Sequence, residues 1–244
     1  MLKQNDVNIC TPVTGQTMED VTEEVRSIVP KNPDLFEWRA DHFRNLADTD
    51  HVLETLETIG EVKKDIPLLF TIRDQKEGGD QTDIDQSHKV ELIERVAANS
   101  HVSLLDFELR QPEEDVERVK EAASSNNKQL ILSFHDFDST PSSEEMHAIL
   151  REAEKKGADY AKLAVTPENK QDVLRLLTVT EGAKRSLGIP VITMAMGGLG
   201  TVTRMFAWYF GSVITYAVGK HASAPGQIPI EELDKTIAQL RKYQ

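Results

Sequence analysis

Cysteine, aromatic side chains and long apolar runs are all scarce in this 244-residue sequence. The single cysteine, Cys10, excludes an intrachain disulfide and fits a reducing compartment. No apolar run approaches the length that crosses a membrane, and the first residues, MLKQND, form no hydrophobic signal region. We therefore expect a soluble, cytoplasmic protein.

Positive charge is also in short supply. Asp and Glu number 41 against 28 Lys and Arg, which gives a net charge of −13. This balance argues against non-specific binding of nucleic acid and against attraction to an anionic membrane surface. An anionic substrate would need its basic ligands gathered in one place, against the overall charge.

Several cofactor signatures are missing as well. The first predicted strand runs into residues 10–15, CTPVTG, which lack the glycine-rich turn that binds a dinucleotide. The sequence contains no Walker phosphate loop, no His-Glu-x-x-His zinc helix and no Gly-x-Ser-x-Gly elbow. It also contains no linker rich in Gly, Ser or Pro, so we expect one domain over residues 1–244.

The sequence does contain a regular alternation of short apolar runs and charged, helix-periodic stretches. The apolar runs predict strands at residues 7–11, 35–39, 68–73, 104–109, 129–134, 160–165, 190–194 and 212–218. The stretches between them predict helices at 17–28, 49–62, 84–97, 113–124, 142–156, 167–186, 201–210 and 231–242. Eight such units fit an α/β fold of the (β/α)₈ TIM-barrel type, which usually has ~250 residues. An open doubly wound sheet is the competing fold, which the missing glycine-rich turn disfavours.

Local signals mark several helix ends. Thr17 and Asp48 have the side chains of N-caps, and Pro167 is predicted at a first helical position. Gly60 is expected to end its helix early, because glycine commonly follows the last helical turn.

Lys162 lies in residues 160–165, YAKLAV, which have the length and composition of a buried strand. Lysine is rarely buried without a partner. Either Lys162 lies at a strand end and extends its amine to water, or the amine projects into a cleft as a nucleophile. Desolvation or a neighbouring cation favours the neutral amine that attacks a carbonyl.

Polar side chains recur where the other predicted strands end, which is where (β/α)₈ barrels place their active sites. The side chains found there are Glu37, Arg39, Asp41, Arg73, Asp106, Glu108, His135 and Arg204. Each also has a structural reading, such as an ion pair between Glu37 and Arg39 or a fully hydrogen-bonded His135. Their shared position on one rim favours a catalytic site.

Six segments, in order and spacing, resemble those of the type I 3-dehydroquinate dehydratases of the shikimate pathway. They are residues 37–41 (EWRAD), 70–73 with 77–79 (FTIR, EGG), 133–137 (SFHDF), 162–166 (KLAVT), 196–204 (MGGLGTVTR) and 223–227 (SAPGQ). The resemblance covers essentially the whole chain. Thr203 departs from the serine expected before Arg204, at a position with no expected chemical role.

The resemblance implies elimination of water from 3-dehydroquinate through a Schiff base, without a metal or cofactor. Lys162 would form the imine, His135 would act as general base and then general acid, and Glu77 would orient His135. The residues implied to bind substrate are Glu37, Arg39, Arg73, Met196, Arg204, Ser223 and Gln227. The family is often dimeric, which implies a homodimer, and the apolar residues 205–210 (MFAWYF) suit an interface as well as a core.

Two other functions stay open at this point. A Schiff-base aldolase on the same barrel would also use a lysine on the sixth strand, with Gly197 and Gly198 in a phosphate site. A catalytically inactive barrel could be retained as a binding module. Two geometric expectations accompany the preferred function. At least one of Asp106 and Glu108 should face inward, toward Lys162 or an arginine, and residues 220–227 should form a mobile lid.

Overall fold

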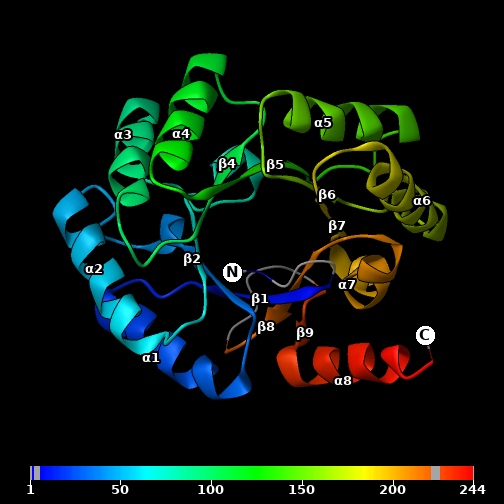
Figure 1. Cartoon of the computed structure of the whole chain (residues 1–244), viewed down its shortest axis with the longest axis horizontal. Coiled ribbons are helices and arrows are strands. Elements are labelled where there is room, and N and C mark those ends of the chain that lie inside the picture. The colour runs from blue at the N-terminus through cyan, green and yellow to red at the C-terminus, as the bar shows by residue number, and fades with distance from the viewer. Residues whose placement is uncertain (1, 3–5, 221–225, 244) are drawn as a thin grey trace.

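The computed structural model describes residues 2, 6–220 and 226–243, and a ring of helices surrounds its central strands (Figure 1). The strands are β1 Asn8–Val13, β2 Leu35–Arg39, β3 Leu68–Thr71, β4 Leu104–Glu108, β5 Gln129–Asp136, β6 Tyr160–Val165, β7 Val191–Ala195, β8 Ile214–Val218 and β9 Ile228–Pro229. They follow the order β7-β6-β5-β4-β3-β2-β1-β8-β9, and the paired neighbours are parallel. All eight predicted strands are present, and the predicted (β/α)₈ barrel is confirmed.

The barrel closes between β7 and β8, where pairing is reduced to an isolated parallel bridge between Val191 and Ser212. The Ser212 hydroxyl accepts a hydrogen bond from the Thr193 N–H at 3.0 Å, and the Val213 N–H donates to the Val191 carbonyl at 2.9 Å. Strand β9, which the sequence did not predict, extends the sheet beside β8. A strand of two residues is too short to show the period of two by which strands are recognised.

Helices follow the strands and cover the outside of the barrel (Figure 1). They are α1 Met18–Ile28, α2 Thr49–Val62, α3 Gln86–Ala97, α4 Glu113–Ser125, α5 Ser143–Lys155, α6 Lys170–Ser186, α7 Gly197–Phe210 and α8 Ile230–Arg241. The described residues also form the 3₁₀ helices η1 Val29–Lys31, η2 Ala40–His42 and η3 Gln75–Glu77. Within the part of the chain that the structure describes, no helix is long and apolar enough to cross a membrane.

Capping side chains explain where the helices begin. Thr17 and Asp48 each accept a hydrogen bond from a first-turn N–H of α1 and α2, as predicted. The prediction that Pro167 occupies a first helical position is wrong, because α6 begins three residues later. Asn169 caps this helix, since its side chain accepts hydrogen bonds from two N–H groups of the first turn.

Gly60 lies inside α2, which continues to Val62, so the prediction that it ends the helix is wrong. A β-carbon at position 60 would lie 2.3 Å from the ring of His101. The absence of a side chain therefore permits a close approach between α2 and the segment that leads into β4. This glycine serves packing rather than helix termination.

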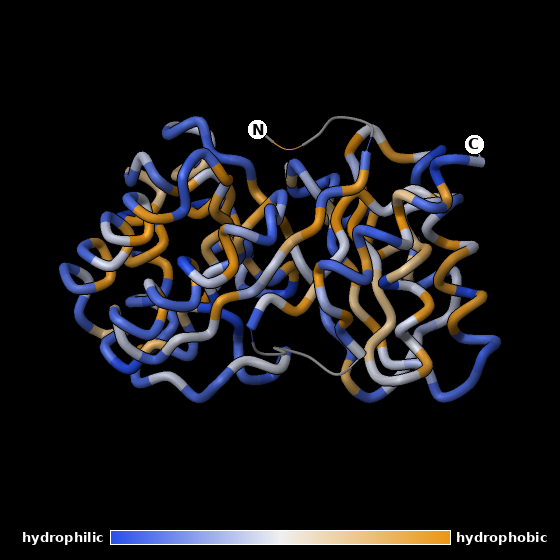
Figure 2. Tube along the Cα trace, turned by 90° about the horizontal axis from the view of Figure 1, so that it is seen from below, coloured by the Kyte–Doolittle hydropathy of each residue, from blue (hydrophilic) through white to orange (hydrophobic). Residues whose placement is uncertain are grey.

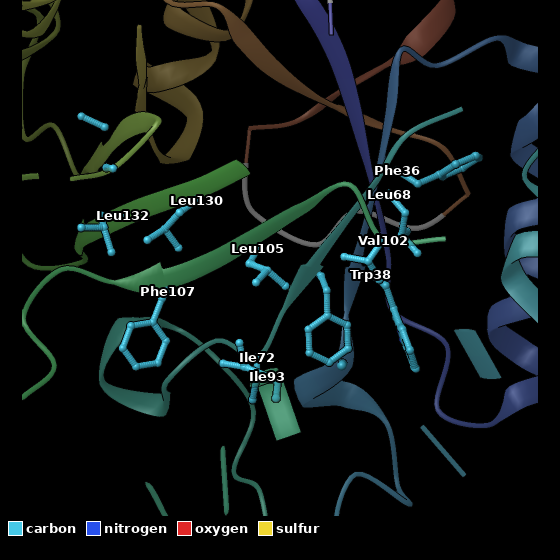
Figure 3. Packing of buried hydrophobic residues seen from close by; sticks show 14 of the residues in the cluster. Phe36, Trp38, Leu68, Ile72, Ile93, Val102, Leu105, Phe107, Leu130 and Leu132 are labelled. Carbon is cyan, nitrogen blue, oxygen red and sulfur yellow. The ribbon is translucent and has the colours of Figure 1, made fainter. Parts of the chain in front are cut away.

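Two apolar layers stabilise the barrel. The outer layer packs the helices onto the sheet, and Figure 3 shows part of it around Trp38, Leu105 and Phe107. The inner layer fills the amino-terminal half of the barrel with Leu35, Leu69, Leu104, Ile131, Tyr160, Ile192 and Ile214. In Figure 2 the outer turns of the helices are mostly hydrophilic while apolar segments lie toward the sheet.

Burial of each large apolar side chain contributes about 1.5–3 kcal/mol to the stability of the folded protein. The amino-terminal half of the barrel is therefore a packed core.

Candidate active site

One layer of the barrel interior brings four strands together above the apolar core. Its members are Glu37 from β2, Asp106 from β4, Lys162 from β6 and Tyr216 from β8, and all four are buried. Alternate residues of a strand point to the same face, and alternate strands of a (β/α)₈ barrel contribute to the same layer. The alternation of side chains along these strands therefore places two carboxylates, an amine and an aromatic ring in one layer.

Lys162 lies at the centre of this layer with 4% of its surface exposed. Its Nζ lies 3.0 Å from Asp106 Oδ2, 3.8 Å from Glu37 Oε1 and 4.8 Å from the centroid of the Tyr216 ring. Burial excludes the reading in which this amine extends to water. The contact with Asp106 confirms the expectation that an acidic residue of β4 faces Lys162.

Arg73, which follows β3, connects this layer to the rim above it. One guanidinium nitrogen, Nη2, donates to Asp106 Oδ1 at 2.6 Å, while Nη1 donates to Glu108 Oε1 at 3.0 Å and to the Ser133 hydroxyl at 2.7 Å. Lys89 from α3 donates to the other Glu108 oxygen at 2.7 Å. Charges therefore alternate in sign from Lys89 through Glu108, Arg73 and Asp106 to Lys162.

This alternation fixes the ionisation of its members. Burial alone would raise the pKa of Asp106, but the charges of Arg73 and Lys162 hold that pKa well below its usual range. Burial alone would lower the pKa of Arg73, whereas Asp106 and Glu108 raise it. Both groups are charged at neutral pH, so the network compensates its buried charges internally.

His135 and Glu77 form a second unit beside this network. Glu77 Oε2 accepts the backbone N–H of His135 at 3.0 Å and lies 2.9 Å from its Nδ1. Burial, then the charges of Arg73 and Lys162, lower the pKa of His135 well below its usual value. Burial, opposed by Arg73 and assisted by Glu108 and Asp106, raises the pKa of Glu77 to about 7. His135 is therefore a neutral base whose ring is held by a carboxyl group.

Arg39 forms its ion pair with Asp41 rather than with Glu37. Its Nε donates to Asp41 Oδ1 at 2.8 Å and its Nη2 donates to Oδ2 at 2.7 Å, a bidentate arrangement. Glu37 instead accepts a hydrogen bond from the Thr71 hydroxyl at 3.1 Å and faces Lys162. The alternative in which Glu37 and Arg39 pair only with each other does not describe this site.

The opposite side of the rim comes from β7 and α7. Met196 is buried with the inner apolar layer and caps the start of α7, and Arg204 is buried within that helix. Burial lowers the pKa of Arg204 to about 10. Thr203, the departure from the expected serine, accepts the Ala195 N–H at 2.8 Å and so joins α7 to the end of β7.

The two remaining predicted ligands are Gln227 and Ser223. Gln227 is half-buried just before β9, and the adjacent Gly226 carbonyl lies 3.4 Å from the Thr201 hydroxyl of α7. Ser223, and with it most of the predicted lid over residues 220–227, lies outside the described residues. In the described ranges, no three His, Cys, Asp or Glu side chains are grouped as ligands of a metal ion.

Comparison with known sequences relates this geometry to a family. The sequence model described as "Type I 3-dehydroquinase" matches residues 9–244. The chain belongs to the type I 3-dehydroquinase family. A 3-dehydroquinate dehydratase from Geobacillus thermodenitrificans is 46% identical over 235 residues, covering 96% of this chain and 91% of its relative. One from Listeria monocytogenes is 39% identical over 234 residues, covering 96% of this chain and 92% of its relative.

Solved structures of type I 3-dehydroquinase relatives agree with this fold. The 3-dehydroquinate dehydratase from Geobacillus kaustophilus superposes with a TM-score of 0.96 at 43% identity, covering 98% of this chain and 93% of that one. The type I enzyme from Clostridium difficile, described with covalently modified comenic acid, gives 0.95 at 35% identity, covering 100% and 95%.

Some residues of this type I 3-dehydroquinase site were not identified from the sequence. From the sequence alone, Tyr216 is interpreted as one more apolar residue of β8. Lys89 is likewise interpreted as part of the solvent-facing side of α3. Ser133 belongs to a segment that resembles the family, but the sequence assigned it no role of its own. Their contacts cross the barrel or come from the helix layer, so no spacing within one strand predicts them.

Proposed function

We propose that this chain is a single-domain 3-dehydroquinate dehydratase that eliminates water through an imine on Lys162. The observation that carries the proposal is the buried Lys162 amine, held by Asp106 beside the His135–Glu77 unit. Membership of the type I 3-dehydroquinase family supports the substrate and the reaction.

In the proposed reaction the Lys162 nitrogen attacks the ketone carbon, and loss of water from the adduct gives a protonated imine. The imine withdraws electrons from the adjacent carbon, so His135 can remove a proton from it and leave an enamine. The enamine electrons then expel the hydroxyl group as His135 returns the proton, which releases water. Hydrolysis of the remaining imine restores Lys162 and releases 3-dehydroshikimate.

The His135–Glu77 contact supports this assignment of the base. A lowered pKa keeps His135 neutral and able to accept a proton at neutral pH. Because Nδ1 faces Glu77, Nε2 is the nitrogen left to exchange the substrate proton. Glu77 thereby fixes the orientation of the ring.

The remaining rim residues suit a hydroxylated carboxylic acid. We assign the ring hydroxyls to Glu37, Arg39 and Arg73, and we assign Met196 to an apolar wall beside the imine. Arg204 would bind the carboxylate together with Ser223 and Gln227. The lowered pKa of Arg204 supports this role, because a bound anion favours the charged guanidinium and offsets its burial.

We further propose a cytoplasmic homodimer that joins two copies through the α6–α7 surface. This surface exposes Leu174, Leu199, Val202 and Tyr209, with exposed fractions of 42–57%. Large apolar side chains exposed on two helices that pack together are typical of an interface. Analytical ultracentrifugation should find a dimer, and Leu174→Glu with Val202→Glu should yield monomers. A monomeric wild-type protein would contradict this assignment.

The test of the function combines an assay with chemical trapping. The protein should produce the ultraviolet absorption of an enone from 3-dehydroquinate. Borohydride added with that ligand should inactivate it and add mass to the peptide containing Lys162. Lys162→Ala should lose the label and nearly all turnover, whereas Lys170→Ala, at an exposed lysine, should keep both. A label on another lysine would refute the mechanism, and a folded protein without turnover would indicate a binding module.

A further inference from the structure

Tyr216 contacts the proposed nucleophile although the reaction outlined above does not use it. Tyr216 is 4% exposed, and the centroid of its ring lies 4.8 Å from Lys162 Nζ. Asp106 and Glu37 contact the same nitrogen at 3.0 and 3.8 Å. Lys162 is therefore held by two carboxylates and by the face of one aromatic ring.

The ring and the carboxylates respond differently when the nitrogen reacts. An ammonium group has three N–H donors, so it can satisfy both carboxylates, but a protonated imine keeps only one. The imine therefore cannot donate both to Asp106, which accepts a hydrogen bond from the ammonium, and to Glu37, which lies 3.8 Å away. Attraction between a cation and an aromatic face needs no N–H, so it persists as long as the nitrogen carries positive charge.

We propose that the ring of Tyr216 stabilises positive charge on the Lys162 nitrogen, both in the ammonium form and in the protonated imine. The ring would thus support the electron-withdrawing state from which His135 removes a proton. The part that concerns the imine rests on the function proposed above, whereas the part that concerns the ammonium does not.

Other titratable groups also lie around this nitrogen and must be left unchanged in any test. They are Glu37 from β2, Arg73 after β3, Asp106 from β4, His135 from β5 and Cys10 from β1. Substitutions are therefore confined to Tyr216, which leaves these groups in place. Tyr216→Phe keeps the ring, Tyr216→Leu removes it, and Tyr216→Met removes it with a longer, flexible side chain. Tyr160→Leu is the matched control, because Tyr160 is a buried tyrosine in the amino-terminal half of the barrel.

The first measurement needs no substrate. Reductive methylation of Lys162 by formaldehyde and borohydride is followed across pH by mass spectrometry of its peptide. Without the ring the neutral, reactive amine should form more readily, so the pH midpoint of labelling should fall by about one unit in Tyr216→Leu and Tyr216→Met. Tyr216→Phe and Tyr160→Leu should keep the wild-type midpoint.

The second measurement is turnover of 3-dehydroquinate. We expect Tyr216→Leu and Tyr216→Met to lower kcat about 30-fold, equivalent to about 2 kcal/mol, while Tyr216→Phe stays within about threefold of wild type. Unchanged midpoints in both ring-free variants would overturn the inference, and so would a Tyr216→Phe variant as impaired as Tyr216→Leu. A shifted midpoint with unchanged kcat would overturn the role in the imine. A wild-type protein with no turnover, but with the expected midpoint shift, would refute the proposed function and leave the contact with the ammonium established.

Discussion

The β2–β6 side and the β7–β8 side of the barrel meet at one rim, but different forces hold them in place. The first side carries a network of charges that runs from Lys89 to Lys162, whose hydrogen bonds join opposite charges or a charge and a hydroxyl. The second side carries Met196 and Tyr216, which pack in the inner apolar layer, and Arg204, which is buried within α7. The charged side is thus arranged before substrate arrives, because its geometry is what keeps its own buried charges compensated.

The largest effect should come from removing the base on the charged side. His135→Ala should lower kcat by about 10²–10⁴-fold, because no other group exchanges the substrate proton. Imine formation needs only Lys162, so slow borohydride labelling of the Lys162 peptide should remain. A variant that keeps near-wild-type turnover would contradict the division of roles between these two residues.

Removing a carboxylate from the network should cost more stability than removing any apolar group from the other side. Asp106→Ala leaves Arg73 and Lys162 without a buried counter-charge, and we expect it to lower the free energy of unfolding by about 3–5 kcal/mol. Asp106→Asn, which keeps the shape but loses the charge, should show a smaller loss. Urea denaturation measures both. Equal stability of Asp106→Ala and wild type would show that the network is not needed for folding.

The raised pKa of Glu77 predicts a pH dependence with a definite sign. A carboxyl whose pKa rises from 4.5 to about 7 on folding stabilises the protein below pH 4.5, and this stabilisation is lost as pH rises through 7. The change should be about 3 kcal/mol at most. His135, whose pKa is lowered, opposes this trend in part of the same range, so the comparison must be made against a variant.

That variant is Glu77→Gln, which stays neutral throughout. Between pH 5 and pH 8, wild type should lose free energy of unfolding relative to Glu77→Gln, as measured by urea denaturation at each pH. Glu114→Gln, at an exposed position, should follow wild type. Parallel behaviour of wild type and Glu77→Gln would mean that Glu77 titrates in the folded protein as it does in the unfolded chain.

The smallest effect should come from an apolar residue on the β7–β8 side. Met196→Leu conserves volume and removes no charge, so it should lower the free energy of unfolding by less than about 1.5 kcal/mol. Thermal or urea denaturation would measure this change. A loss as large as that of Asp106→Ala would remove the distinction between the two sides.

The positions of polar residues at the predicted strand ends indicated that they would meet at one rim. This reasoning included Glu37, Asp106 and Lys162, which the structure brings into one layer. It could not predict Lys89, because that contact depends on how α3 packs onto β4. Nor could it predict that Arg39 pairs with Asp41 at the turn after β2, where the strand period has ended.

The errors in the predicted helices have a similar origin. Pro167 and Gly60 were interpreted from local preference alone, while the observed structure depends on a better cap at Asn169 and on the approach of His101. Tertiary contacts decide such cases, since propensities contribute only fractions of a kcal/mol to about 1 kcal/mol per residue.

The closure between β7 and β8 has a mechanical consequence. Elsewhere in the barrel neighbouring strands are joined by a ladder of backbone hydrogen bonds, but here the Val191–Ser212 bridge and the Ser212 hydroxyl make the connection. We expect the barrel to deform first between β7 and β8, where the fewest backbone hydrogen bonds resist movement. Because β7 leads to Met196 and Arg204, strain from an arriving ligand would be absorbed on that side as a small hinge rotation. The charged half of the ring, whose strands are joined by continuous ladders, would move less.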